Sequence, residues 1–322
     1  MNSLCKKNIR SIIICIFFIS LFFSSGCSQN RLNPPQNISV VNAKEYAGSE
    51  WVEAYNLLCH ESPILSRAGR AANSSLIEPS QLFDNLWVFG RAETVVFILQ
   101  TSEGYVLIDT FYLGQTESVL LPALQQLDID PQEIILAIIA HGHADHYGGS
   151  RFLQSNYDTP IAASEEDWQL IEDQSDRFAT PEYDISISDG EVINIGGIDI
   201  HNFLIPGHTP GSLGLIFPVY DGGVEYMAGL FGGTILASDR IDNEGLAIYL
   251  DSLERFKEVA SSLNVTVELQ NHPVIDNLDL KLMNLAIRNP SDPHPFVLEN
   301  SIYINFLDVI SECTKAELFR RK

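Results

Sequence analysis

The segment HGHADH, from His141 to His146, carries three imidazoles and a carboxylate within six residues. His141 and His143 are two positions apart, so on an extended chain their side chains project to the same side. Asp145 and His146 fall in the turn that follows and can aim at a neighbouring point. Neutral imidazole and carboxylate suit Zn²⁺, with bonds of about 2.0–2.2 Å. The segment therefore predicts a metal centre rather than a solvated polar loop.

The residues before this segment indicate how it is held. Residues 134–140 read IILAIIA, a continuous apolar run that is typical of a strand buried on both faces. The metal-binding residues would then lie at the carboxyl end of a core strand, a place that favours function. We found no Ser–His–Asp or Cys–His motif that would supply a nucleophilic side chain instead.

Four motifs together resemble the metallo-β-lactamase superfamily. VLIDT at Val106–Thr110 is similar to its first motif, HGHADHYGG to its HxHxDH signature, PGHTPGS at Pro206–Ser212 to its third motif and NHP at Asn271–Pro273 to its last. They occur in the order typical of the superfamily. The resemblance implies an α/β protein with the four-layer αββα sandwich, in which Asp109 orients the metal loop. The usual Gly two residues after that Asp is replaced by Phe111.

The resemblance also implies a ligand set for two Zn²⁺ ions per chain. One ion would take His141, His143 and His208. The other would take Asp145, His146 and His272. Two zinc ions that share a water lower its pKa towards about 7 and supply hydroxide. Asp145 is the expected catalytic residue, because it can also accept a proton from that water. The remaining histidines, His60, His201 and His294, are expected to be surface or structural residues.

A metal-bridging Asp, present in many branches of the superfamily, is missing. The corresponding stretch reads YMAGLFGGT, with Leu230 at the position of that Asp. The pattern resembles the subclass with a His/His/His and Asp/His/His site and no Cys ligand. Asp239 is the only candidate for a displaced bridging ligand. In that subclass hydroxyl residues of this stretch bind the substrate carboxylate, and here Thr234 is the only candidate.

Strand and helix patterns alternate in two halves from Leu86 onward, which suggests two packed sheets with helices outside. Helical spacing is expected at residues 115–127, 149–156, 165–172, 252–263, 277–287 and 301–320. The predicted organisation is a lipoprotein signal peptide at 1–26, a lipidated tether at 27–48 and the hydrolase domain at 49–322. The long segment 49–85 is expected to dock on the core through Trp51, Tyr55 and Leu58.

The N-terminus indicates export. MNSLCKKNIR is a basic region, the next 13 residues are mainly apolar, and SSGC at Ser24–Cys27 resembles a bacterial lipobox. Cys27 would then carry lipid, and the protein would be anchored in the bacterial cell envelope, facing the periplasm. Cys59 and Cys313 remain in an oxidising compartment, where a disulfide is permitted. The sequence does not decide whether these two residues meet.

The net charge of the chain limits the kinds of partner that it can bind. The chain of 322 residues has 19 basic and 42 acidic side chains, and without its first 26 residues the net charge is −26. Such a surface repels polyanions, so no nucleic-acid partner is expected.

The substrate is expected to be a small molecule. The first hypothesis is a zinc-dependent hydrolase that opens a β-lactam or a related cyclic amide with a metal-bridged hydroxide. The alternatives are a lactonase, thioesterase or other ester hydrolase, or a non-catalytic lipid-anchored binding protein.

Overall fold

The computed structural model describes residues 37–61, 75–235 and 241–322. The predicted signal peptide, Cys27 and the first part of the predicted tether lie outside these residues, as does Asp239. The described residues form one compact unit.

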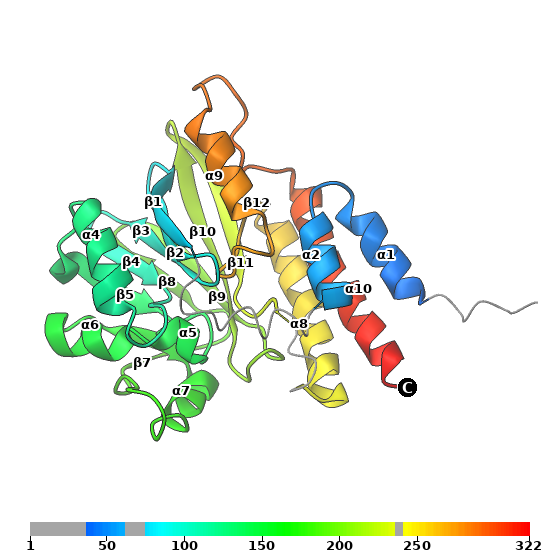
Figure 1. Cartoon of the computed structure of the whole chain (residues 1–322), viewed down its shortest axis with the longest axis horizontal. Coiled ribbons are helices and arrows are strands. Elements are labelled where there is room, and N and C mark those ends of the chain that lie inside the picture. Colours follow the sequence, from blue (N-terminus) through cyan, green and yellow to red (C-terminus); the bar gives the residue numbers. More distant parts are fainter. Residues whose placement is uncertain (1–36, 62–74, 236–240) are drawn as a thin grey trace, which may run out of the picture. The chain divides into compact units, whose positions relative to one another are not determined.

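Among the described residues, a first sheet of seven strands contains the apolar runs that precede the metal-binding motifs (Figure 1). Its first four strands pair antiparallel as a meander, and β4 through β7 pair parallel. The strands are β1 (Leu76–Phe83), β2 (Leu86–Arg91), β3 (Val95–Gln100), β4 (Tyr105–Ile108), β5 (Ile134–Ile138), β6 (Ile161–Ser164) and β7 (Ile185–Ile187). The carboxyl ends of the parallel strands therefore lie at one edge, where the loops after β4 and β5 meet.

A second sheet of five strands has the order β12-β11-β10-β9-β8. Its strands pair antiparallel, except that β12 lies parallel to β11. They are β8 (Val192–Ile195), β9 (Ile198–Leu204), β10 (Leu213–Asp221), β11 (Val224–Phe231) and β12 (Val265–Leu269). Buried side chains from both sheets, such as Phe97 of β3 and Phe217 of β10, share one apolar core, so the sheets pack face to face.

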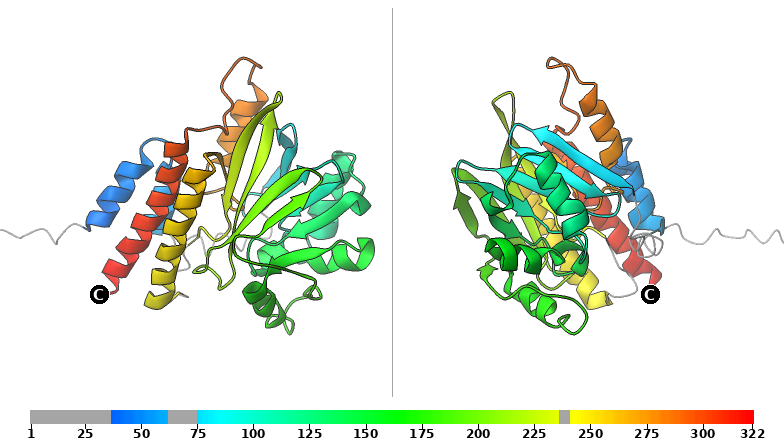
Figure 2. Two further views of the ribbon diagram at one scale, coloured as in Figure 1. Left: turned by 180° about the vertical axis from the view of Figure 1, so that it is seen from behind. Right: turned by 60° about the vertical axis from the view of Figure 1, so that its left-hand side comes forward.

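Helices cover the outer face of each sheet (Figures 1 and 2). A second apolar cluster joins α4 (Leu121–Gln126), α6 (Ser150–Tyr157) and α7 (Glu165–Glu172) to the first sheet. A third joins α8 (Asn243–Ser262) and α10 (Asn300–Arg320) to the second sheet. The short elements η2 (Thr116–Leu120), η3 (Pro131–Glu133) and α5 (Ala144–Tyr147), and the helix α9 (Leu278–Ala286), complete the unit. The predicted αββα sandwich is confirmed.

The structure corrects the predicted end of the tether. Ile38–Ala47 forms α1, which buries Ala43 and Ala47, and the side-chain amide of Asn37 donates to the Ala316 carbonyl of α10. The tether prediction therefore extended about ten residues too far. The small buried alanines give this helix only a weak apolar stripe, so the pattern did not reveal it.

The rest of the described N-terminal segment, residues 48–61, is bound to α10 by a hydrogen bond and a disulfide. It forms α2 (Val52–Asn56) and η1 (Leu57–Glu61). The Trp51 indole donates to the Ile302 carbonyl at 2.9 Å, and Cys59 forms a disulfide with Cys313 of α10. Of the three residues expected to dock, Trp51 and Leu58 are buried and Tyr55 is partly buried, and all three pack against the outer helical layer.

None of the helices in residues 37–61, 75–235 and 241–322 is both long enough and apolar enough to cross a membrane.

Candidate metal centre

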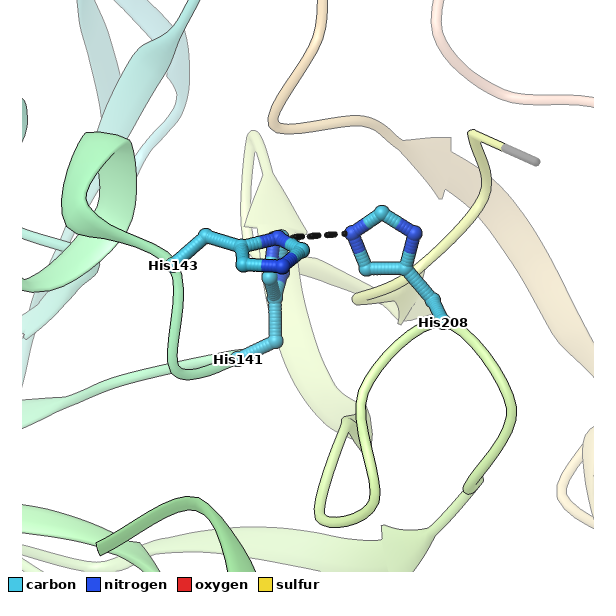
Figure 3. Close-up of side chains that lie close together, drawn as sticks. All are labelled: His141, His143 and His208. Carbon is cyan, nitrogen blue, oxygen red and sulfur yellow. Dashed lines mark hydrogen bonds between the residues drawn. The ribbon is translucent and has the colours of Figure 1, made fainter. Parts of the chain in front are cut away.

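Three histidine rings converge where the loop after β5 meets the loop between β9 and β10 (Figure 3). The His208 Nε2 atom lies 3.2 Å from the His141 Nε2 atom and 3.1 Å from the His143 Nδ1 atom. The ring planes of these residues meet nearly at right angles, between 84° and 88°. Their nitrogens therefore face one common point rather than stacking side by side.

This spacing fits a tetrahedral zinc site. With Zn–N bonds of about 2.0–2.1 Å, neighbouring ligand nitrogens of a tetrahedron lie about 3.3–3.4 Å apart. The distances of 3.1 and 3.2 Å within the histidine cluster are close to that edge length. The sequence-predicted first ligand set is thus brought together in a geometry that can hold one ion.

The second predicted set also comes together. Ligand atoms of Asp145, His146 and His272 all lie within 4.8 Å of one another. The His146 Nε2 atom is buried, forms no hydrogen bond within the described part of the chain and lies 3.5 Å from an Asp145 carboxylate oxygen. The ring centroids of His141 and His146 are only 3.8 Å apart, so the two groups adjoin. This arrangement suits two neighbouring metal ions.

Acceptors behind the rings select which nitrogen points inward. The Nδ1 atom of His208 lies 2.6 Å from the Ile235 carbonyl, and that of His272 lies 2.7 Å from the Glu93 carbonyl. A ring N–H that donates to such a carbonyl leaves the Nε2 lone pair free for a metal ion. Neither carbonyl could be identified from sequence, because each belongs to a loop distant along the chain.

Electrostatics favour the ligand forms of three of the histidines and of Asp145. Burial, together with the other histidines, lowers the pKa of His141 and of His208 well below the usual value. Burial and His146 also lower the pKa of His272. Although burial disfavours its charge, His146 and His272 hold the pKa of the Asp145 carboxyl well below its usual value. Neutral imidazoles and an ionised carboxylate are the forms that bind zinc.

Asp109 lies beneath the second group, as the resemblance implied. One carboxylate oxygen accepts from the Ala140 backbone N–H at 2.8 Å, and the other lies 2.7 Å from His146 Nδ1 and 3.2 Å from the side-chain amide of Asn271. Burial lowers the pKa of His146, but the Asp109 and Asp145 carboxylates outweigh this and raise it to about 10. These carboxylates favour the protonated ring, and a metal ion at Nε2 would compete with that proton.

Phe111 occupies the expected glycine position in a glycine-like conformation. Its φ is +68°, in the left-handed region that favours glycine, and it is completely buried. Its ring packs 5.5 Å from that of Phe89, and a Cβ on Gly90 would lie 2.6 Å from the Phe111 ring. The missing side chain at Gly90 thus makes room for the Phe111 ring, whose burial offsets a strained backbone.

The stretch where a bridging Asp was missing offers no carboxylate among the described residues. Leu230 is buried in the core between the sheets. Thr234 is 1% exposed, and its hydroxyl donates to the Phe231 carbonyl at 2.9 Å. The structure therefore does not support a substrate contact by Thr234. Thr234 lies in a tight turn directly after β11, and this turn directs its hydroxyl back to the Phe231 carbonyl. The spacing of the residues in the sequence did not predict that turn.

The other histidines lie outside the metal centre. The His60 Nε2 atom lies 3.0 Å from the Tyr55 hydroxyl on the surface. His201 lies in β9, opposite Ile216 of β10. His294 is buried, stacks on Phe83 at 4.3 Å and lies 2.9 Å from the Leu82 carbonyl. Asp167 of α7, which no sequence motif indicated, is buried beneath the loops of the first group.

We expect the purified protein to hold about two zinc ions per chain, because two three-residue ligand groups are complete. Replacing His208 with Ala should empty chiefly the first group, and replacing His272 with Ala the second. Metal analysis of dialysed samples would test this. A single ion in the unmutated protein, with no loss on replacing His272, would contradict the two-metal assignment.

Comparison with known proteins gives a consistent result. Residues 90–221 match the model of the metallo-β-lactamase superfamily. The chain is 29% identical over 113 residues to a hydroxyacylglutathione hydrolase of Haemophilus influenzae, a match of 32% of this chain and 51% of that protein. It is 24% identical to an N-acyl homoserine lactonase of a Bacillus species, over 58% of this chain and 81% of that protein. The chain thus spans about half the length of the first curated relatives it matches.

Solved structures resemble the chain over a longer range. A subclass B3 metallo-β-lactamase of Bradyrhizobium japonicum superposes with a TM-score of 0.66 at 22% identity. The match covers 77% of this chain and 96% of that structure. At this identity the likeness shows the fold.

Proposed function

We propose that the protein is a two-zinc hydrolase of β-lactams or related cyclic amides. Residues 90–221 match the model of the metallo-β-lactamase superfamily, and the described chain has the fold of that superfamily. The observation that supports this most strongly is the pair of adjoining, complete ligand groups. Zinc ions held there would act as Lewis acids that acidify water and polarise a scissile carbonyl.

The chain's own contribution to the reaction would come from Asp145. Its side chain is 21% exposed, whereas the neighbouring His146 side chain is fully buried. One carboxylate oxygen faces His146, at 3.5 Å from Nε2, so the group lies at the boundary between the buried site and solvent. A carboxylate in this place can hold the attacking water and receive its proton.

The absence of a bridging Asp supports a cyclic amide over an ester as substrate. Leu230 occupies the position where many ester-hydrolysing branches of the superfamily have that Asp. The relatives named as hydroxyacylglutathione hydrolase and lactonase support the alternative, an ester or thioester hydrolase of the same fold. A non-catalytic binding protein is the least supported function, since a decayed site would be expected to have lost a ligand.

A substrate screen tests the proposal. Purified protein with zinc would be assayed against a chromogenic cephalosporin, acyl-homoserine lactones and thioesters. We expect hydrolysis of the cephalosporin that disappears in the variant with Ala at His208. Hydrolysis of lactones or thioesters alone would replace the β-lactam proposal by the alternative. No hydrolysis of any of these substrates by a zinc-loaded sample would refute the proposal.

We further propose that the protein is exported and anchored by lipid on Cys27. The order of basic residues, apolar residues and SSGC supports this, as does the Cys59–Cys313 disulfide, since such bonds persist in oxidising compartments. Replacing Cys27 with Ala should release the protein from membranes or block its processing. Fractionation and immunoblotting would measure this, with Cys5→Ala, in the predicted signal peptide, as control. Unchanged membrane retention of the Cys27 variant would show another kind of anchor.

A further inference from the structure

We propose that Asp167 is a positioning residue that holds all three ligands of the first metal group in place. This inference rests on the two-metal site proposed above. Asp167 lies in the first turn of α7, at the outer helical layer of the first sheet. It does not belong to either ligand group, and its side chain reaches two loops that are far apart in the sequence.

Both carboxylate oxygens of Asp167 accept hydrogen bonds from these loops. One oxygen accepts from the Gly142 backbone N–H at 2.7 Å and from the Thr209 hydroxyl at 2.8 Å. The other accepts from the Gly211 backbone N–H at 2.9 Å. Since Gly142 lies between His141 and His143, and Thr209 follows His208, one carboxylate connects the backbones that carry all three imidazoles.

The packing leaves little freedom around this carboxylate. A Cβ on Gly142 would lie 3.2 Å from the Asp167 carboxyl carbon, and a Cβ on Gly211 would lie 2.6 Å from the Asp167 backbone nitrogen. The Ser164 hydroxyl, at the start of α7, donates to the Gly211 carbonyl at 2.7 Å. The start of α7 and the two loops are therefore in direct contact, and a shift of one loop would break bonds to Asp167.

The cost of burying the Asp167 carboxylate explains why it would favour one distance between the two loops that donate to it. Asp167 is 0% exposed, and no ion pair to a basic side chain is formed by it within the described residues. A buried carboxylate is costly unless fixed donors replace its water. The three hydrogen bonds fill that role, so separation of the loops would leave a buried charge without its donors.

Asp109 has the corresponding position beneath the second group. It connects the Ala140 backbone, His146 and Asn271, which precedes the ligand His272. Asp167 does the same for His141, His143 and His208, but through backbone and hydroxyl donors rather than through the rings. Each ligand group thus has one buried carboxylate that sets the distance between its two loops.

Zinc affinity measured in two single-site backgrounds tests the inference. In the His272→Ala background only the first group is complete, and in the His208→Ala background only the second. In the Asp167→Asn variant a side-chain N–H₂ group replaces one carboxylate oxygen, so it faces a loop N–H or hydroxyl donor and cannot accept its hydrogen bond. We expect it to weaken zinc binding about 10–100-fold in the first background, the usual effect of losing such a support. Binding in the second background should not change, as measured by competition with a chromophoric chelator.

Glu166→Gln is the matched control, because it removes the same charge from an exposed neighbouring side chain. It should leave both affinities unchanged. Should Asp167→Asn fail to fold by circular dichroism, Thr209→Val removes a single donor and should give a smaller loss in the first background only. Equal losses in both backgrounds, or no loss in the first, would overturn the inference. Backgrounds that bind no zinc at all would overturn the two-metal proposal as well.

Discussion

Replacing Asp145 with Asn is expected to lower turnover by a factor of about 10² or more, the scale for losing a proton-handling group. Asn keeps the shape of the side chain and one ligand oxygen, but it removes the negative charge. The Asp145 carboxylate lies 3.5 Å from His146 Nε2. Burial opposes its ionisation, but His146 and His272 hold its pKa well below the usual value. Without that charge the attacking water would lose both its orientation and its proton acceptor.

Loss of the second zinc ion could mimic this result, so metal content must be measured on the same sample. Asp128→Asn is a suitable control, because Asp128 is exposed and its φ of +57° is tolerated by Asn. That variant should retain full turnover. An Asp145→Asn protein with both metals and a near-full rate would mean that Asp145 is only a ligand, and that another residue orients the water.

Replacing Lys281 with Met is expected to lower the free energy of unfolding by about 3–5 kcal/mol, the usual cost of removing one partner of a buried ion pair. The Lys281 ammonium lies 3.0 Å from a carboxylate oxygen of Glu268 and 3.0 Å from one of Asp276, and all three side chains are nearly inaccessible. It also lies 5.6 Å from the Trp51 ring centroid, so it contacts the N-terminal segment. Denaturant unfolding would measure the loss.

The loss should grow with pH. Burial outweighs the attraction of Lys281 and raises the pKa of Glu268 to about 7. A carboxyl whose pKa is higher in the folded than in the unfolded protein costs stability as pH rises from the unfolded towards the folded value. Without Lys281 the folded pKa rises further, so the variant should lose more stability than the unmutated protein between pH 6 and pH 8.

Lys315→Met provides the control for this experiment. Its ammonium pairs with Glu312, but its side chain is 44% exposed, and such pairs contribute little. A loss for Lys281→Met no larger than that of the control, or one independent of pH, would show that the buried cluster does not stabilise the fold.

Most elements after Leu86 were predicted from the sequence because their patterns are local. The apolar run at 134–140 forms β5, and the predicted helices at 165–172 and 301–320 match α7 and α10. The helix predicted at 252–263 is longer, since α8 begins at Asn243. The strands β6 and β7 were missed, because each has only three or four residues and pairs through neighbours distant in sequence.

The metal ligands were also accessible from the sequence. Four of the six lie in one hexapeptide after one strand, so a single strand and turn determine most of their arrangement. His208 and His272 could be included because their motifs resemble those of a known family in order. The residues that define the chemistry are thus contiguous or part of a motif, and their types alone limit what they can bind.

Only the tertiary structure decided which residues support that chemistry. The residues SEED at Ser164–Asp167 indicate only the start of a helix. In the structure the Asp167 carboxylate points away from that helix and accepts hydrogen bonds from the backbone N–H groups of Gly142 and Gly211. Cys59 and Cys313 are 254 residues apart in the sequence, and their pairing required α10 to lie beside η1. Thr234 turned inward to the Phe231 carbonyl. These contacts join loops and helices through packing of separate layers, and no local periodicity encodes which buried donor will meet which acceptor.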